Sequence, residues 1–104
     1  MTILAGGIGS RFWPASTPER PKQLLRLGTK EPLIVDTMRR AAALVPTERI
    51  RILAGENLRS PIKSVLPSLE RDNFWIEPQA RGTAPVLAWA AAKLAQLDPE
   101  AVMV

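Results

Sequence analysis

The segment ILAGGIGSRFWPASTPERPKQLL, residues 3–25, decides how the rest of the chain is interpreted. It begins as a short apolar strand and continues, from Ala5 to Leu24, as a loop with three glycines, three prolines and three cations. A connection of this length without apolar periodicity is uncommon in a compact domain and is usually functional. The sequence therefore predicts a loop that holds a ligand.

The composition is typical of one small globular domain: 104 residues, 46% apolar and 23% charged. The chain has no cysteine and no histidine, which excludes disulfides, thiolate metal sites, and Ser–His or Cys–His nucleophile pairs. It contains no apolar run long enough to span a membrane and lacks the layout of a signal peptide. We therefore expect a cytoplasmic protein that does not act on a membrane.

The net charge of +4 comes entirely from residues 11–30, which carry five basic side chains and one acidic side chain. A concentrated basic loop suits a small polyanion such as a nucleoside triphosphate, and the alternative is a solvated basic surface. Nucleic-acid binding usually needs a wider basic face or a series of exposed aromatic residues. We expect no nucleic-acid partner.

Apolar strands and helices alternate along the chain. The predicted strands are 2–5, 50–54, 74–76 and 101–104, with a brief strand or a turn at 24–27. The predicted helices are 33–45 after Pro32, a second helix capped by Ser60 with Pro61 in its first turn and a buried face running to Leu69, and 84–97 capped by Thr83. This order predicts an α/β fold, a parallel sheet with flanking helices.

Two features suggest that residues 1–104 are the N-terminal, nucleotide-binding part of a longer domain. The sequence stops inside an apolar strand, and ligands of open α/β sheets gather beyond the carboxyl ends of such strands. The helix 84–97 is apolar almost all round, so it is either buried on most sides or packs on something outside this sequence. The alternative is a small complete domain with a short last strand.

The glycine loop matches neither of two familiar phosphate-binding patterns. Gly7 and Gly9 would begin G-x-G-x-x-G, but Phe12 stands at the third position, and Lys22 lies too far along for a Walker loop. Glycines still let backbone N–H groups approach phosphate oxygens, and Arg11 can bind two such oxygens at once. The prolines stiffen the loop. The alternative is a glycine turn with scattered surface cations.

At these residues the sequence resembles a known family. Residues 4–25, LAGGIGSRFWPASTPERPKQLL, look like the signature loop of the sugar-1-phosphate nucleotidyltransferases, G-G-x-G-[ST]-R-[LF]-x-P followed by P-K. Trp13 and the triplet at 21–23, PKQ, narrow the resemblance to the mannose-1-phosphate guanylyltransferase branch. The segment IEPQARGTAP, residues 76–85, is similar to that branch's E-P-x-x-R-N-T-A-P. Gly82 replaces the asparagine, and Ile8 replaces a residue that is usually small.

The resemblance implies a Rossmann-like nucleotidyltransferase domain. Its reaction would transfer GMP from GTP to mannose 1-phosphate, giving GDP-mannose and pyrophosphate with the help of Mg²⁺. The family's metal-binding aspartate would follow Val104, so no metal ligand is expected within this chain. GTP and mannose 1-phosphate would be the partners, and a homodimer is left open.

The resemblance also assigns residues to roles. The backbone of Gly6 and Gly7 and the side chain of Ser10 would lie against the nucleotide phosphates. Arg11 would stabilise the pentacoordinate phosphorus and the departing pyrophosphate, and Lys22 would hold phosphate charge near the reacting centre, which makes these two the expected catalytic residues. The expected nucleotide-binding residues are Leu4, Ala5, Gly6, Gly7, Gly9, Ser10, Arg11, Lys22, Glu77, Pro78, Arg81, Thr83 and Ala84.

The second motif leaves several alternatives open. Glu77 either accepts hydrogen bonds from guanine or is a solvated charge at a strand end. Arg81 either pairs with Glu77 or binds phosphate. Thr83 is predicted to cap its helix and can still direct its backbone N–H at a nucleotide.

Other side chains are assigned structural roles. Trp75 and Trp89 are predicted to belong to the core rather than to stack on a base. Asp36 is predicted to be a solvated charge on a helix and Glu56 a solvated charge at a strand end.

Two other functions compete with guanylyl transfer. One is a nucleotidyltransferase that uses another base or another sugar 1-phosphate. The other is a non-catalytic domain that binds nucleotide sugars and regulates a partner, against which the intact Arg11 and Lys22 argue.

Overall fold

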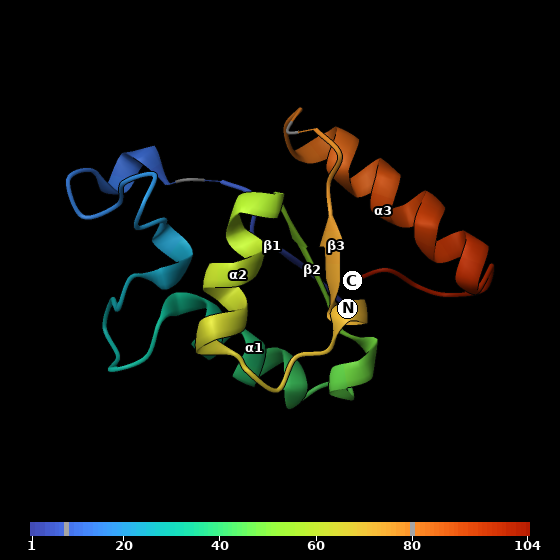
Figure 1. Ribbon diagram of the computed structural model, residues 1–104. Helices are drawn as coiled ribbons and strands as arrows, with labels where there is room; N and C mark the ends of the chain where they lie inside the picture. Colours follow the sequence, from blue (N-terminus) through green and yellow to red (C-terminus); the bar gives the residue numbers. More distant parts are fainter. Residues whose placement is uncertain (8, 80) are drawn as a thin grey trace.

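A three-stranded parallel sheet with helices on both faces forms the fold of the computed structural model, which describes residues 1–7, 9–79 and 81–104. The strands lie in the order β1 (Thr2–Leu4), β2 (Arg51–Ala54), β3 (Phe74–Ile76). The helices are α1 (Leu33–Ala42), α2 (Glu56–Val65) and α3 (Thr83–Leu97). This arrangement (Figure 1) confirms the predicted α/β class.

Parallel pairing places two distant loops at the same end of the sheet. The hydrogen bonding continues past the strands, since Ala5 N–H donates to the Leu53 carbonyl at 2.8 Å and Glu77 N–H donates to the Ala54 carbonyl at 3.0 Å. Parallel strands share one direction, so the chain leaves β1 and β3 at the same edge of the sheet. The glycine loop and the second motif therefore start at the same edge of the sheet, on either side of β2.

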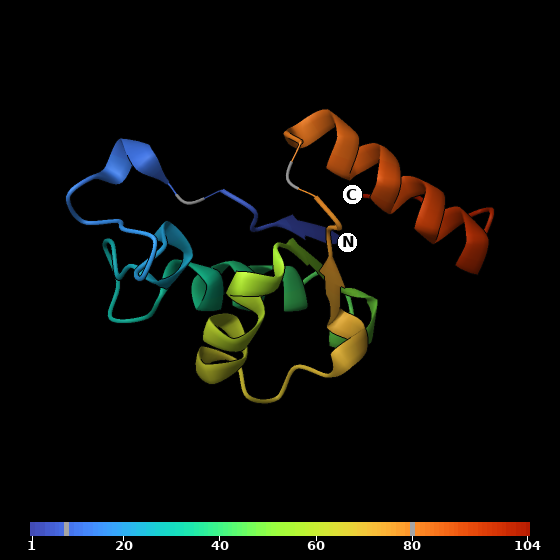
Figure 2. The same ribbon diagram turned by 45° about the horizontal axis from the view of Figure 1, so that its top comes forward.

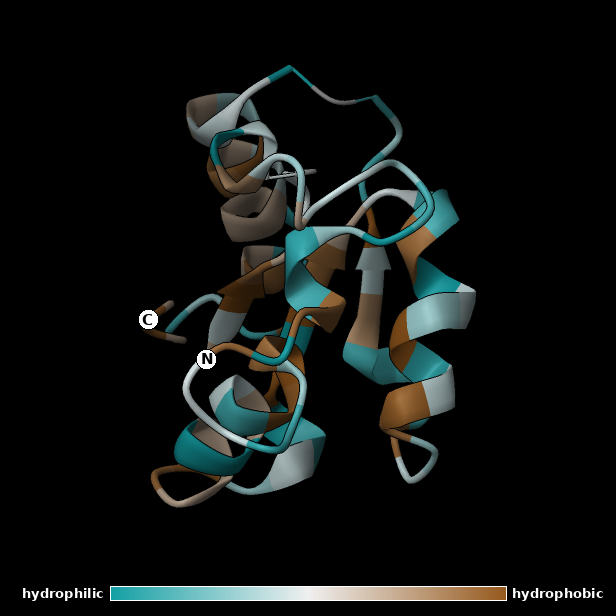
Figure 3. Ribbon diagram, turned by 90° about the vertical axis from the view of Figure 1, so that its left-hand side faces the viewer, coloured by the Kyte–Doolittle hydropathy of each residue, from teal (hydrophilic) through white to brown (hydrophobic). Residues whose placement is uncertain are grey.

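The larger core lies between the sheet and the pair α1 and α2. Strand residues that point to this face alternate with residues that point to the other, as expected of a pleated strand. The buried side chains of this core include Ile3, Ile52, Ile34, Met38, Leu58 and Ile62. Figure 3 shows these apolar strands and helix faces behind loops that are mostly hydrophilic.

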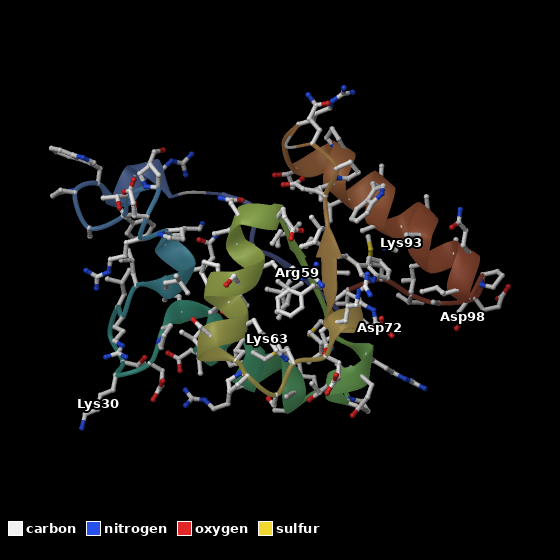
Figure 4. The ribbon with its side chains drawn as sticks, viewed as in Figure 1. Lys30, Arg59, Lys63, Asp72, Lys93 and Asp98 are labelled. Carbon is white, nitrogen blue, oxygen red and sulfur yellow. The ribbon has the colours of Figure 1, made fainter. Side chains whose placement is uncertain are left out.

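α3 packs on the opposite face of the sheet through a small core (Figure 2). Trp75 is 4% exposed and meets Trp89 edge-on, with ring centroids 6.3 Å apart. The Nζ atom of Lys93 lies 5.0 Å and 5.2 Å from the centroids of these two rings (Figure 4), a cation–π arrangement. Trp75 and the partly buried Trp89 are core residues, as predicted.

The rest of α3 is more exposed than its apolar sequence suggests. Within the described chain, Ala90 is its one buried residue, and Leu97 is 66% exposed. The interpretation of a helix buried on most sides is therefore wrong for this structure.

The start of α2 differs from the prediction. Ser60 and Pro61 lie inside the helix, which begins at Glu56 after Gly55. Leu58 and Ile62, spaced one turn apart, are both buried, and packing this pair against the sheet extends the helix backward from the proline. Glu56 is thus a first-turn helical residue rather than a strand-end charge, and it pairs with Arg59 at 3.7 Å.

The chain after α3 does not form the predicted strand at 101–104. Among the described residues, its hydrogen bonds to the sheet involve one residue: the backbone N–H of Thr2 donates to the carbonyl of Val104 at 2.6 Å, and the Thr2 hydroxyl donates to the same oxygen at 3.0 Å. A strand needs a repeated ladder, and one paired residue does not supply it.

The structure also decides where α1 ends and whether residues 24–27 form a strand. α1 ends at Ala42, three residues before the predicted end at Val45. Residues 24–27, predicted as a brief strand or a turn, form no strand, and Leu24 is the last residue of a 3₁₀ turn at Lys22–Leu24.

Asp36 is 5% exposed, so the prediction of a solvated charge is wrong. Its carboxylate accepts hydrogen bonds from the Thr29 hydroxyl and the Arg39 guanidinium, each at 2.5 Å, and these partners offset the cost of burial.

None of the described helices has the length and apolar character needed to cross a membrane.

Leu58→Ala in the full-length protein tests the early start of α2. Leu58 is 2% exposed, so truncation should lower the free energy of unfolding by about 2–5 kcal/mol. Urea denaturation measures the change. The control is Leu44→Ala, at a side chain 74% exposed, with an expected change within about 0.5 kcal/mol. Equal effects of the two substitutions would contradict the packing of the first turn of α2.

Candidate nucleotide-binding site

The glycine loop offers a row of backbone N–H groups. Gly6 and Gly7 are exposed at the end of β1, and a turn at Gly9 leads into a 3₁₀ helix at Ser10–Phe12. In the described part of the chain, no hydrogen bond uses the N–H groups of Gly6, Gly7, Gly9 or Ser10. Successive unpaired N–H groups form a concavity of positive potential that suits an anion.

Lys22 lies directly against the glycine loop. Gly9 has φ +76, and a Cβ atom built on it would stand 2.5 Å from Lys22 Cβ and 2.8 Å from Lys22 Cγ. Only glycine fits this position, for two reasons: the backbone conformation is left-handed, and the lysine stem fills the space of a side chain. The structure thus brings the two halves of the first motif together.

Two hydrogen-bonding side chains that the sequence did not single out as site residues support this loop. The hydroxyl of Ser16, a buried residue, donates to the Gly9 carbonyl at 2.5 Å. The amide of Gln23 donates to the carbonyls of Ala5 and Gly7. The signal available in the sequence was the position of Gln23 directly after Lys22, but its partners become visible only in three dimensions.

Positive charge around the loop is not neutralised by ion pairs in the described chain. The two ion pairs found there, Asp36–Arg39 and Glu56–Arg59, lie outside residues 11–30. Arg11 is exposed on the 3₁₀ helix. Hydrogen bonds from its own backbone and from the Thr17 side chain lower the pKa of Glu19, the one acid of the segment, so this carboxyl stays ionised at neutral pH.

Glu77 reaches the glycine loop from β3. A Cβ atom built on Gly6 would lie 2.9 Å from Glu77 Oε1, so the carboxylate rests against the first glycine. Among the described residues Arg81 makes no ion pair with Glu77, and its Nε donates to the Gln79 side-chain oxygen at 2.9 Å. Glu77, Pro78 and Arg81 line one wall of a cavity of about 300 Å³, opposite Val86 and Trp89 of α3.

Gly82 stands where the family pattern has asparagine, and its backbone conformation favours glycine. It is the N-cap of α3, with φ +93 and ψ −178, a conformation almost restricted to glycine. Thr83 is the first helical residue and makes no side-chain capping hydrogen bond, so the prediction of a Thr83 cap is wrong. Ile8, the other departure, lies outside the described residues, as does Ala80 of the second motif.

The remaining expected residues lie apart or at the margin. The Leu4 side chain lines a cavity of about 390 Å³ with Thr37 and Leu44, beside α1. Pro78 and Ala84 are exposed at the start of the second motif and of α3. The two larger cavities, of about 680 and 520 Å³, lie along α2 and β3 and contain none of the expected site residues.

The described residues of this site offer few metal ligands. Among the described residues, no three potential ligand side chains cluster, and Glu77 is the carboxylate that contacts the glycine loop. Mg²⁺ takes oxygen ligands in near-octahedral geometry, usually with one or two carboxylates. The expectation of a metal ligand following Val104 stays a prediction.

Comparison with known proteins agrees with this geometry. The family model described as Nucleotidyl transferase matches residues 1–104. The chain belongs to the nucleotidyl transferase family.

Among its relatives, the Mannose-1-phosphate guanylyltransferase of Salmonella muenchen is 35% identical over 91 residues, which are 86% of this chain and 19% of that protein. The Alginate biosynthesis protein AlgA of Pseudomonas aeruginosa is 36% identical over 99 residues, with 88% and 19% covered. A crystal structure described as mannose-1-phosphate geranyltransferase from Thermus thermophilus matches with a TM-score of 0.74 and 30% identity, covering 92% of this chain and 28% of that one. The chain thus spans about a fifth of the length of its curated relatives.

Gly9→Ala tests the contact between the glycine loop and Lys22. A left-handed backbone costs a residue with a Cβ about 1–2 kcal/mol, and the overlap with the lysine stem adds to that cost. We expect lower stability in urea denaturation and weaker GTP binding in calorimetry of the full-length protein.

Two control variants separate the effects. Gly28 has φ +79 and open space where a Cβ would stand, so Gly28→Ala reports the cost of the left-handed backbone alone. Gly7, the site of the Gly7→Ala control, has neither a left-handed backbone nor an atom within 4 Å of a Cβ built on it. Equal losses of GTP affinity in Gly9→Ala and Gly28→Ala would show that the Lys22 contact is unimportant.

Proposed function

We propose that this chain is the nucleotide-binding part of a mannose-1-phosphate guanylyltransferase, which transfers GMP from GTP to mannose 1-phosphate and releases pyrophosphate. The observation that carries the proposal is the glycine loop, where the N–H groups of Gly6, Gly7, Gly9 and Ser10 have no hydrogen-bond partner among the described residues and lie next to Lys22 and Glu77. Relatives named mannose-1-phosphate guanylyltransferase, at 35–36% identity over 91 residues, support the choice of sugar and base.

The reaction needs no histidine base. A phosphate oxygen of mannose 1-phosphate attacks the α-phosphorus of GTP, the bond from that phosphorus to the bridging oxygen breaks, and pyrophosphate leaves with the electron pair. The attacking oxygen is already anionic near neutral pH. The protein therefore has to align two polyanions and stabilise developing negative charge, which backbone donors and cations can do.

The residues divide this work by position. The N–H groups of Gly6, Gly7 and Gly9 would hold the phosphates, with Lys22 beside them as a fixed positive charge. Arg11, on an exposed 3₁₀ helix next to those groups, would bind the phosphoryl oxygens in the transition state. Glu77 would accept hydrogen bonds from the N1–H and the amino group of guanine, donors that adenine does not present in this pattern.

A panel of nucleotides tests the proposed reaction. The full-length protein is supplied with mannose 1-phosphate and with GTP, dTTP, UTP or CTP, and pyrophosphate release is measured. We expect the highest kcat/KM with GTP because a carboxylate acceptor matches the two guanine donors. A preference for dTTP would contradict the guanine assignment, and no release with any nucleotide would favour a regulatory binding domain.

Arg11→Ala tests the catalytic role. Loss of a donor directed at transition-state charge should lower kcat by on the order of 10²-fold or more, with a smaller change in the KM for GTP. The matched control is Arg26→Ala, which removes the same charge from an exposed site in the same basic segment. An unchanged kcat would remove Arg11 from the mechanism.

A further inference from the structure

Gln23 has a buried side chain to which the proposed reaction assigns no role. It is 5% exposed and lies in the 3₁₀ turn Lys22–Leu24. Its Nε2 atom donates to the carbonyl of Ala5 at 2.5 Å and to the carbonyl of Gly7 at 2.6 Å. Both neighbours are acceptors, so the amide must direct its nitrogen toward them.

These two hydrogen bonds hold the Ala5 and Gly7 carbonyls toward the interior, and the first of them sets the direction of the Gly6 N–H. In a trans peptide unit the N–H points opposite to the C=O, and the Ala5–Gly6 peptide bond is trans. Because Gln23 binds the Ala5 carbonyl on the buried side, the Gly6 N–H points to the other side. If the Ala5 or Gly7 carbonyl turned outward instead, its partial negative charge would repel a phosphate.

Gln23 also couples the glycine loop to the lysine. Its neighbour Lys22 packs its stem on Gly9, while Gln23 binds the carbonyls of Ala5 and Gly7. One short turn therefore contacts the loop at three alternate residues. Any shift of this turn would move the lysine and the backbone donors together.

We propose that Gln23 is the positioning residue of the phosphate-binding loop: it holds the Ala5 and Gly7 carbonyls inward, so that these oxygens stay away from the triphosphate and the Gly6 N–H faces it beside Lys22. This inference rests on the proposed function. Gln23 itself does not touch the substrate, because it is buried beneath the loop.

A second buried amide in the same chain shows what a purely structural role looks like. Asn73 donates to the carbonyls of Thr47 and Ile50 at 2.8 and 3.0 Å, and its own oxygen accepts the Glu70 N–H at 2.8 Å. Every hydrogen-bonding atom of Asn73 thus has a partner. By contrast, the Oε1 atom of Gln23 is buried without a partner among the described residues.

Among the described residues the side-chain oxygen of Gln23 has no donor, so the hydrogen bonds that Gln23 makes there are the two from its nitrogen to the loop. An apolar residue of the same length would leave the two loop carbonyls without their donor. Leaving a buried acceptor without a hydrogen bond costs about 1–3 kcal/mol.

The test compares matched substitutions in the full-length protein. Gln23→Met and Asn73→Leu each replace a buried amide by an apolar side chain of similar length, and Gln23→Glu keeps the shape but places carboxylate oxygens against two carbonyls. Stability is measured by urea denaturation, GTP and guanosine binding by calorimetry, and KM for each substrate by pyrophosphate release.

We expect both Gln23 variants to raise the Kd and the KM for GTP at least roughly tenfold, the effect of losing about 1.4 kcal/mol of binding free energy. Guanosine, which has no phosphates, should lose less than threefold in affinity, and the KM for mannose 1-phosphate should change less than the KM for GTP. Asn73→Leu should lower stability and leave GTP affinity within about twofold.

Several results would overturn the inference. Wild-type GTP affinity in Gln23→Met, or equal losses for GTP and guanosine, would make Gln23 a structural residue. Recovery of both Gln23 variants only as unfolded protein, with Asn73→Leu folded, would do the same. Failure of the wild-type protein to bind GTP would instead contradict the proposed function, so the two failures are distinguishable.

Discussion

The pairing of β2 with both β1 and β3 in parallel is the constraint on which the site depends. Two consecutive carbonyls of β2, at Leu53 and Ala54, receive the N–H groups of Ala5 and Glu77. These hydrogen bonds bring motifs from opposite ends of the sequence to one edge of the sheet. The contact between Gly6 and the Glu77 carboxylate follows directly from this register.

The electrostatic potential of this edge of the sheet favours a negatively charged ligand. The N–H groups of the glycine loop, Arg11 and Lys22 all contribute positive potential, and the acidic side chains of the two ion pairs lie elsewhere in the described chain. Concentrated like charge is unfavourable for the protein alone. A polyanion bound at the loop would relieve that repulsion, so the same residues that destabilise the free loop would stabilise its complex.

Local patterns predicted β1, β2 and β3 and most of α1 and α3, because strand and helix periodicity are properties of nearby residues. They also predicted a strand at 101–104 that the structure does not contain. They failed where distant contacts decide. The start of α2 depends on burying Leu58 against the sheet, and Asp36 is buried because Thr29 and Arg39 supply donors. The support of the loop by Gln23 and Ser16 was also missed, since a side chain's hydrogen-bond partners are not written in its position along the chain.

The hydrogen bonds from Thr2 to the Val104 carbonyl have one more consequence. The Thr2 N–H faces away from β2, because polar groups of β1 point to opposite sides at alternate residues and those of Met1 and Ala5 pair with β2. The chain therefore travels outward from β1 in one direction, through β2 to β3, and later comes back to the opposite flank of β1. A reversal of winding at the first strand separates the loops on its two sides, and α/β sheets leave room for a ligand at that point.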